Sequence, residues 1–202
     1  MKVIGITGGV GAGKSTVVDI LRKHFETEYL HCDAIAHEIM EQGGSAYSEL
    51  LTLFGKDITN PDGSLNRSRL YEVAFLGGRV EELNACVHPK VRTYVEDKIA
   101  SLKSSGFSGM VLIEAALLIE AGYKAICDEL WYVYAPESLR RERLRANRGY
   151  DDARVDAIMA KQASEELFFS ESDFVLRNDS SAEECEAHIL EQVRKHQSME
   201  VA

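Results

Sequence analysis

The fold is decided by the stretch Val3-Ile4-Gly5-Ile6-Thr7-Gly8-Gly9-Val10-Gly11-Ala12-Gly13-Lys14-Ser15-Thr16. Its first five residues are a short apolar run, typical of a strand buried on both faces of a parallel sheet. Gly8–Ser15 then match the phosphate-loop pattern G-x-x-x-x-G-K-[ST]. Apolar residues follow at helical spacing, at Val17, Ile20, Leu21 and Phe25. A structural glycine turn does not explain this agreement of motif and context, so strand, loop and helix together predict a nucleotide-binding P-loop.

The chemistry of this loop assigns roles to its residues. Glycines let the backbone turn tightly and bring its N–H groups to phosphate oxygens. The helix N-terminus behind the loop adds unpaired N–H donors and a partial positive charge. Lys14 can neutralise the β- and γ-phosphates, and the Ser15 hydroxyl can ligate Mg²⁺. The predicted phosphate-binding residues are Gly8, Gly9, Val10, Gly11, Ala12, Gly13, Lys14, Ser15 and Thr16.

Composition narrows the class of protein further. The 202-residue chain has 33 acidic and 23 basic residues, a formal net charge of −10. Such acidity argues against general nucleic-acid binding and against attachment to anionic membranes by bulk charge. No apolar run approaches the ~18 residues of a membrane span, and Met1 leads into the first strand without a signal-peptide pattern. We therefore expect a cytoplasmic protein that does not bind nucleic acid or membranes.

The number and spacing of the cysteines agree with a cytoplasmic location. The chain has 4 cysteines, without a C-x-x-C pair. Free cysteines are commonly buried. We expect reduced, mostly buried thiols at Cys32, Cys86, Cys127 and Cys185.

Strands alternating with helices along the chain predict an α/β fold with a five-stranded parallel sheet flanked by helices. The four strands expected after the first are at 29–32, 110–113, 130–134 and 174–176. A helix over Val80–Val87 should stop at His88-Pro89, because proline disfavours helix at the residue before it. Ser181 and Glu184 form a capping-box pattern that opens the last helix.

This order of elements divides the chain into three predicted parts. Residues 1–34, 108–136 and 170–202 make a P-loop core. Residues 35–107 are a helical insertion between the second and third strands, and 137–169 are a charged helical segment.

Two carboxylates are placed at strand ends, where ligands bind in open α/β sheets. Asp33 ends the second strand, and it can accept a proton from an attacking hydroxyl or hold Mg²⁺ through water. Its structural alternative is to cap the helix that begins at Ala34. Glu114 ends the third strand and can assist Mg²⁺, or it is a surface or turn-capping residue.

A cluster of arginines gives the acidic chain a local positive charge. Residues 140–148 hold five arginines and one acid, and so sum to +4. A solvated helix face accounts for some of them, but the guanidinium fork also suits phosphate oxygens. We expect at least one to contact phosphate, in a segment that closes over the nucleotide as a lid.

Motifs along nearly the whole chain resemble the dephospho-CoA kinase family. After the P-loop, residues 32–37 (Cys-Asp-Ala-Ile-Ala-His) are similar to its D-A-D-x-I-A-[RH] segment, with His31 in place of the first acid. Residues 83–92 carry His88-Pro89 as in L-x-x-I-x-H-P-x-V-R, and 137–148 resemble Q-x-x-R-L-x-x-R. Late positions match at Gln162, Asp173 and Asn178. Departures from the family pattern are Glu114 for Asp, Ala116 for Pro, Ile119 for Phe, Arg140 for Gln, and Phe168 for a basic residue.

The resemblance implies an enzyme that transfers the γ-phosphoryl of ATP to the ribose 3′-hydroxyl of dephospho-CoA, giving CoA and ADP in the last step of coenzyme A synthesis, with Mg²⁺. It implies Asp33 as base or orienter, and it places Lys14 and Arg143 at the reacting phosphates. By the same resemblance Arg148 binds ATP, Asn178 lies near adenine, and His88 and Arg92 meet dephospho-CoA on the 35–107 domain. No protein partner is evident.

Two other functions are compatible with the same P-loop. One is a small-molecule kinase acting on a nucleoside or nucleotide, which gives no reason for the His88-Pro89 segment. The other is a regulatory protein that binds ATP without a phosphoryl acceptor.

Overall fold

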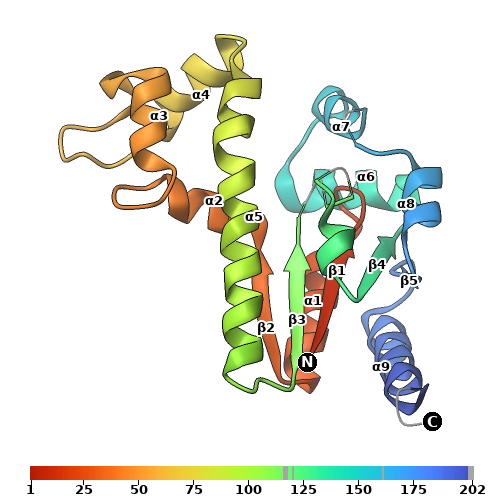
Figure 1. The fold of residues 1–202 in the computed structure, drawn as a ribbon. Coiled ribbons are helices and arrows are strands. Elements are labelled where there is room, and N and C mark those ends of the chain that lie inside the picture. Colours follow the sequence, from red (N-terminus) through yellow and green to blue (C-terminus); the bar gives the residue numbers. More distant parts are fainter. Residues whose placement is uncertain (116–117, 120, 161, 200–202) are drawn as a thin grey trace. The chain divides into compact units, whose positions relative to one another are not determined.

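The chain folds into two compact units (Figure 1). The computed structural model describes residues 1–115, 118–119, 121–160 and 162–199. Contacts group Met1–Leu30 with Phe107–Ala202 in the first unit, and His31–Gly106 in the second. The predicted insertion, 35–107, overlaps the second unit, and the predicted lid, 137–169, belongs to the first.

The first unit is built on a five-stranded sheet of order β2-β3-β1-β4-β5, which confirms the predicted fold class. Its strands are β1 (Lys2–Thr7), β2 (Thr27–His31), β3 (Met110–Glu114), β4 (Glu129–Tyr134) and β5 (Phe174–Arg177). β1 pairs in parallel with β3 and β4, and β4 pairs in parallel with β5. Cys32 was expected to end the second strand but begins a helix.

Apolar side chains of two helices cover the sheet. These helices are α1 (Lys14–His24) and α9 (Ala182–Met199). Val17 and Leu21 of α1 and Ile189 of α9 are fully buried with Ile4 and Trp131 of the sheet. The first helix therefore rests on the core directly behind the glycine loop, which limits how far the loop can move. The predicted capping box opens α9: Ser181 and Glu184 exchange backbone-to-side-chain hydrogen bonds, both of 3.2 Å.

Two aspartates fix the starts of the central strands. The Val3 N–H donates to Asp128 Oδ2 (2.7 Å), while the Asp128 N–H donates to the Val3 carbonyl (2.8 Å). Asp173 makes the same exchange with Leu130, at 2.8 and 2.9 Å. Each carboxylate thus accepts a hydrogen bond from the N–H of a buried residue in a strand of the sheet. A buried N–H is costly to leave unpaired.

Three further helices of the first unit occupy the predicted lid segment. They are α6 (Glu137–Arg148), α7 (Asp152–Met159) and α8 (Glu165–Glu171), and a short 3₁₀ turn, η3 (Tyr123–Ile126), precedes β4. Side chains of Asp151 and Ser164 cap α7 and α8 by accepting from the N–H groups of Arg154 and Leu167. These caps are why one charged segment forms separate helices.

The second unit is helical. Its elements are α2 (Cys32–Met40), α3 (Tyr47–Phe54), the 3₁₀ turn η1 (Lys56–Ile58), α4 (Arg67–Tyr71), the π-helical turn η2 (Glu72–Leu76) and α5 (Val80–Ser104). α2 and α3 pack on α5. No helix in the described ranges combines the length and apolarity that a membrane span requires.

The predicted helix stop at His88-Pro89 is wrong. α5 continues through Pro89 to Ser104. An interior proline removes one hydrogen bond and costs about 3 kcal/mol. The helix continues because its apolar face is buried on both sides of the proline, at Val87, Val91 and Val95 among others, and each such side chain contributes about 1.5–3 kcal/mol.

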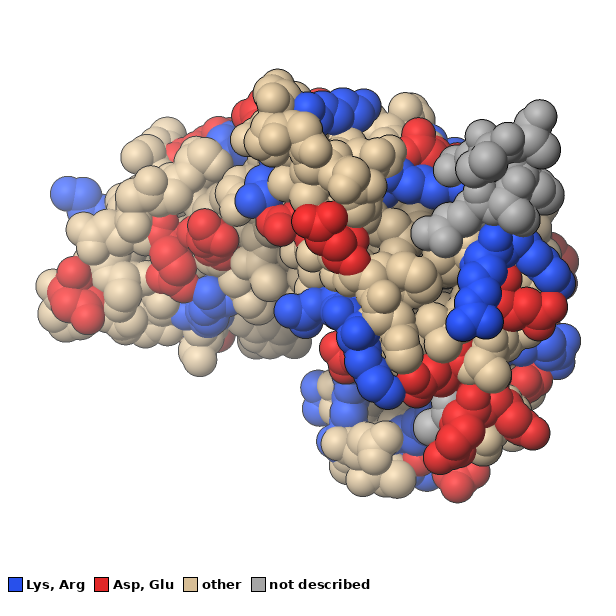
Figure 2. All heavy atoms as spheres, turned by 90° about the horizontal axis from the view of Figure 1, so that it is seen from below, with Lys and Arg blue, Asp and Glu red and all other residues tan. Residues whose placement is uncertain are grey.

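Acidic and basic side chains are interspersed on the face drawn in Figure 2. Ion pairs among the described residues include Lys90 with Glu49 and Lys124 with Glu171. Cys32, Cys86 and Cys185 are buried, as expected, and Cys127 is half-buried.

The aspartate exchange predicts a stability loss. Replacing Asp173 with Ala leaves the buried Leu130 N–H without its acceptor, so the free energy of unfolding should fall by about 1–2 kcal/mol in urea denaturation. Asp173→Asn keeps an acceptor oxygen, so its free energy of unfolding should fall by less. Asp97→Ala, at an exposed position of α5, is the control and should stay within about 0.5 kcal/mol of the parent chain. Equal losses in the two alanine variants would contradict the role given to Asp173.

Candidate phosphate-binding site

The glycine loop joins β1 to α1 in a conformation that only glycine adopts readily. Gly8, Gly11 and Gly13 have φ values of 145°, 79° and 91°, in the region that side chains disfavour. Gly13 occupies the N-cap position of α1, and within the described residues no side chain caps this helix and no acid lies in its first turn. Its first N–H groups are thus left for an anion.

Polar side chains at the start of α1 differ in their surroundings. Lys14 Nζ donates to the Gly8 carbonyl at 2.9 Å, which holds the ammonium group over the loop. Ser15 is exposed in the first turn of the helix. The loop therefore presents a cation and an accessible hydroxyl at the same end of α1.

Side chains from far along the sequence hold this loop in shape. The buried Asn178 donates from Nδ2 to the Ala12 carbonyl at 2.7 Å. Arg143 donates from Nη1 to the carbonyls of Ala12 (3.3 Å) and Gly11 (3.5 Å), and from Nη2 to the Asn178 carbonyl (3.1 Å). Arg143 and Asn178, both predicted site residues, thus come together on the P-loop, where they bind its backbone.

Gln162 is a third contact of the loop. Its Oε1 accepts from the Val10 N–H at 3.0 Å. Sequence reasoning placed Gln162 only as a match to the family pattern and gave it no role. The signal that singled it out was its position in that pattern, since a contact across 152 residues leaves no local trace.

Glu114 lies beside the P-loop strand. It ends β3, and its Cα pairs with that of Ile6 in β1. Tyr29 of β2 donates from its hydroxyl to Glu114 Oε2 at 2.6 Å. Burial, followed by this carboxylate, raises the pKa of Tyr29 well above its usual value, so the phenol stays a donor and orients Glu114. Ala116, another departure from the family pattern, lies outside the described residues.

Asp33 does not cap a helix. α2 begins at Cys32 with His31 at the N-cap position, so the predicted start at Ala34, and with it the capping alternative for Asp33, is wrong. The Asp33 side chain is 67% exposed, and its Oδ2 lies 3.9 Å from His31 Nε2. Its carboxylate is therefore accessible on the second unit.

The remaining predicted residues lie on helix surfaces. His88 is exposed on α5, and Arg92 pairs with Glu96 one turn later (2.8 Å). Arg148 is exposed at the end of α6.

An aromatic cluster accounts for one departure from the family pattern. Phe168 is buried and stacks on Tyr132, with ring centroids 5.0 Å apart. Phe169 meets both Tyr132 and Tyr134. Burial raises the pKa of Tyr132 to about 12. A basic residue at 168 would have to bury its charge among these rings.

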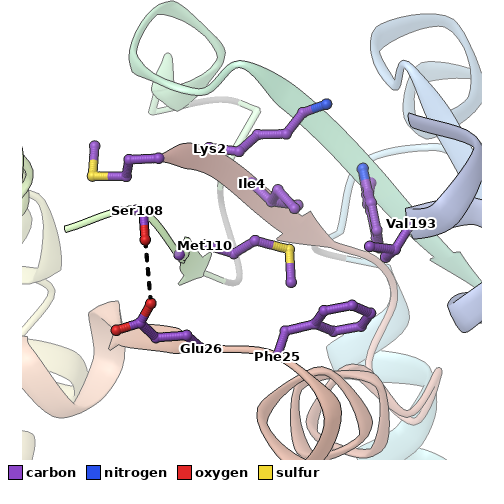
Figure 3. Close-up of a pocket in the computed structure, with 10 residues that line it drawn as sticks. Lys2, Ile4, Phe25, Glu26, Ser108, Met110 and Val193 are labelled. Carbon is purple, nitrogen blue, oxygen red and sulfur yellow. Dashed lines mark hydrogen bonds between the residues drawn. The ribbon is translucent and has the colours of Figure 1, made fainter. Parts of the chain in front are cut away.

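A separate hollow of about 270 Å³ lies at the opposite end of β1 (Figure 3). Lys2, Ile4, Phe25, Met110 and Val193 are among the residues that line it. Because it lies where β1 and β3 begin, and the P-loop follows the end of β1, it is not part of the phosphate site.

The packing of Gly13 gives a test of the loop geometry. A Cβ at Gly13 would lie 2.1 Å from Asn178 Nδ2, whereas one at Gly78 would meet nothing within 4 Å, and both glycines have positive φ. Gly13→Ala should therefore displace Asn178 and weaken ATP binding, measured by calorimetry, by more than about 10-fold. Gly78→Ala carries a similar backbone penalty and should bind ATP as the parent chain does. Equal ATP affinities for the two variants would contradict this geometry.

Comparison with known proteins places this site in a family context. The sequence profile of dephospho-CoA kinase matches residues 2–184. The dephospho-CoA kinase of Carboxydothermus hydrogenoformans is 36% identical over 198 residues, covering 96% of this chain and 94% of the relative. That of Moorella thermoacetica is 36% identical over 166 residues, covering 82% and 78%. A crystal structure of a Thermus thermophilus protein superposes with a TM-score of 0.78 at 31% identity, covering 96% and 97%.

Proposed function

Since the chain belongs to the dephospho-CoA kinase family, we propose that it transfers the γ-phosphoryl group of ATP to the ribose 3′-hydroxyl of dephospho-CoA, giving CoA and ADP. The observation that carries this proposal is the family match over residues 2–184, a range that includes the P-loop and most of both units. The reaction needs alignment and charge neutralisation more than covalent help from the protein.

The P-loop is the donor side of the proposed reaction. Its backbone N–H groups bind the β- and γ-phosphates. Lys14 gives up its hydrogen bond to the Gly8 carbonyl and donates to phosphate oxygens instead. Arg143 supports the reaction by fixing the carbonyls of Gly11 and Ala12, so that the neighbouring N–H groups face the phosphates. We place adenine beside the segment that starts at Asn178, and Arg148 over the phosphates when the lid closes.

Mg²⁺ is the metal that this donor set fits. Ser15 offers an exposed hydroxyl, and Glu114 offers a carboxylate oriented by Tyr29. In nucleotide sites Mg²⁺ takes many of its ligands from phosphates and water, so it needs few ligands from the protein. When bound, Mg²⁺ neutralises the charge that develops on the phosphates. We propose Ser15 as its direct ligand, with Glu114 or Asp33 acting through water.

The second unit supplies the acceptor side. Asp33 is proposed to take the proton of the 3′-hydroxyl, because it follows β2 closely and its carboxylate is exposed. The exposed His88 and the nearby Arg92 of α5 are proposed contacts for dephospho-CoA.

The acceptor dependence of ADP release tests this function. With ATP and Mg²⁺, we expect the chain to release ADP at a rate that rises strongly when dephospho-CoA is added, measured with a coupled ADP assay. Nucleosides and nucleotides in place of dephospho-CoA serve as controls for the rival kinase function. Faster release with one of them, or ATP binding without any acceptor-dependent release, would overturn the proposal.

Substitution of Asp33 tests the base. Asp33→Asn keeps size and polarity but cannot accept a proton, so kcat should fall about 10²–10⁴-fold with the KM for ATP little changed. Glu38→Gln removes an exposed acid from the same helix and should leave kcat unaltered. If Asp33→Asn retains near-full activity, Asp33 is not the base.

A further inference from the structure

Arg140 has a buried donor without an acceptor. Its Nε is inaccessible to solvent and has no hydrogen-bond partner in the described structure. Buried polar groups are nearly always paired, and an unpaired donor on a charged group is costly. The Arg140 guanidinium is therefore held in a place where an acceptor is missing.

That place is the P-loop. A Cβ built on Gly9 would lie 2.0 Å from Arg140 Nη1 and 3.0 Å from Cζ, so the guanidinium lies across this glycine. A Cβ on Gly11 would lie 2.8 Å from the Arg140 carbonyl oxygen, so the backbone of α6 also packs on the loop. Only glycines allow this approach, which sets a cation beside the N–H groups that bind phosphate.

The other arginines of the cluster have different surroundings. Arg141 pairs with Glu137 and Asp156, and Arg145 pairs with Asp152. Arg143 is engaged by backbone carbonyls, and Arg148 is exposed at the helix end. Within the described residues no carboxylate forms an ion pair with Arg140, so its charge is not neutralised next to the loop.

We infer that Arg140 is a phosphate-binding residue, which contacts the polyphosphate chain of the nucleotide at the Gly9 side of the P-loop. On nucleotide binding the guanidinium would turn toward a phosphate oxygen, which supplies the missing acceptor. A guanidinium suits phosphate better than an ammonium group does, because its planar fork can form two parallel bonds. The inference rests on the proposed function only in taking ATP as the nucleotide. The family pattern has Gln at this position, so the contact would distinguish this chain within the family.

The affinity for nucleotide, measured without dephospho-CoA present, tests this role. We expect Arg140→Gln to weaken ATP binding about 10- to 100-fold, as for loss of a charged hydrogen bond, while adenosine binding is unchanged. The affinity for ADP should fall by no more than the affinity for ATP, and Arg140→Lys should retain part of the ATP affinity. Arg145→Gln, on the same helix but paired with Asp152, is the matched control and should bind ATP like the parent chain. The measurements are calorimetric titrations of each variant, with unfolding curves to show that the variants are folded.

A salt series adds a second readout. Since Arg140→Gln removes one cation from the phosphate site, its ATP affinity should fall less steeply with ionic strength than that of the parent chain. Unchanged ATP affinity in folded Arg140→Gln, or an equal loss for ATP and adenosine, would overturn the inference. If the parent chain binds ATP but does not phosphorylate dephospho-CoA, the proposed function fails, and the affinity series still decides the role of Arg140.

Discussion

The proposed phosphate site depends on one carbonyl group, that of Ala12. It accepts hydrogen bonds from Asn178 and Arg143, so the glycine loop is tied to the end of β5 and to α6. Glycine-rich segments lose the most conformational entropy on folding, and without these ties the loop would sample many shapes. Together with the bond from the Val10 N–H to Gln162, they hold the proposed phosphate-binding loop in one shape.

The sheet places this loop and supports it from both ends. β1 is central, with β3 and β4 on either side. Glu114 pairs in register with Ile6, near the end of β1 just before the loop. At the other end of the sheet, Asp128 and Asp173 fix the strand starts. Strand positions set at one end carry over to the other, because a paired strand cannot slip in register without moving its buried side chains to the wrong face. The hydrogen bonds at the strand starts thus also position the proposed phosphate site.

Net charge and local charge play separate roles in this chain. The overall charge of −10 is spread over a surface where acids and bases pair. The arginines of α6 have four kinds of surroundings: Arg141 and Arg145 pair with acids, Arg143 binds the loop backbone, Arg148 is exposed, and Arg140 has no described acid partner. A small cationic site in an acidic protein favours small phosphate-bearing ligands over polyanions.

Local sequence signals predicted the parts of the fold that local physics controls. The P-loop, the five strands and the capping box at Ser181 all follow from short patterns, and all are present. The stop at Pro89 was wrong, because burial along the whole of α5 outweighs one lost hydrogen bond. The hydrogen bonds to Ala12 and Val10 could not be predicted from sequence, since they join residues 131 to 166 positions apart. Their partners Asn178 and Gln162 were visible only through family resemblance, and the packing of Arg140 on Gly9 was visible only in the structure.

The most direct measurement is the identity of the product, by ³¹P NMR of the chain incubated with ATP, Mg²⁺ and dephospho-CoA. The account predicts a new phosphomonoester resonance coupled to the ribose H3′ proton, growing in step with ADP. Phosphate appearing on another hydroxyl, or ADP accumulating with inorganic phosphate and no new ester, would contradict it.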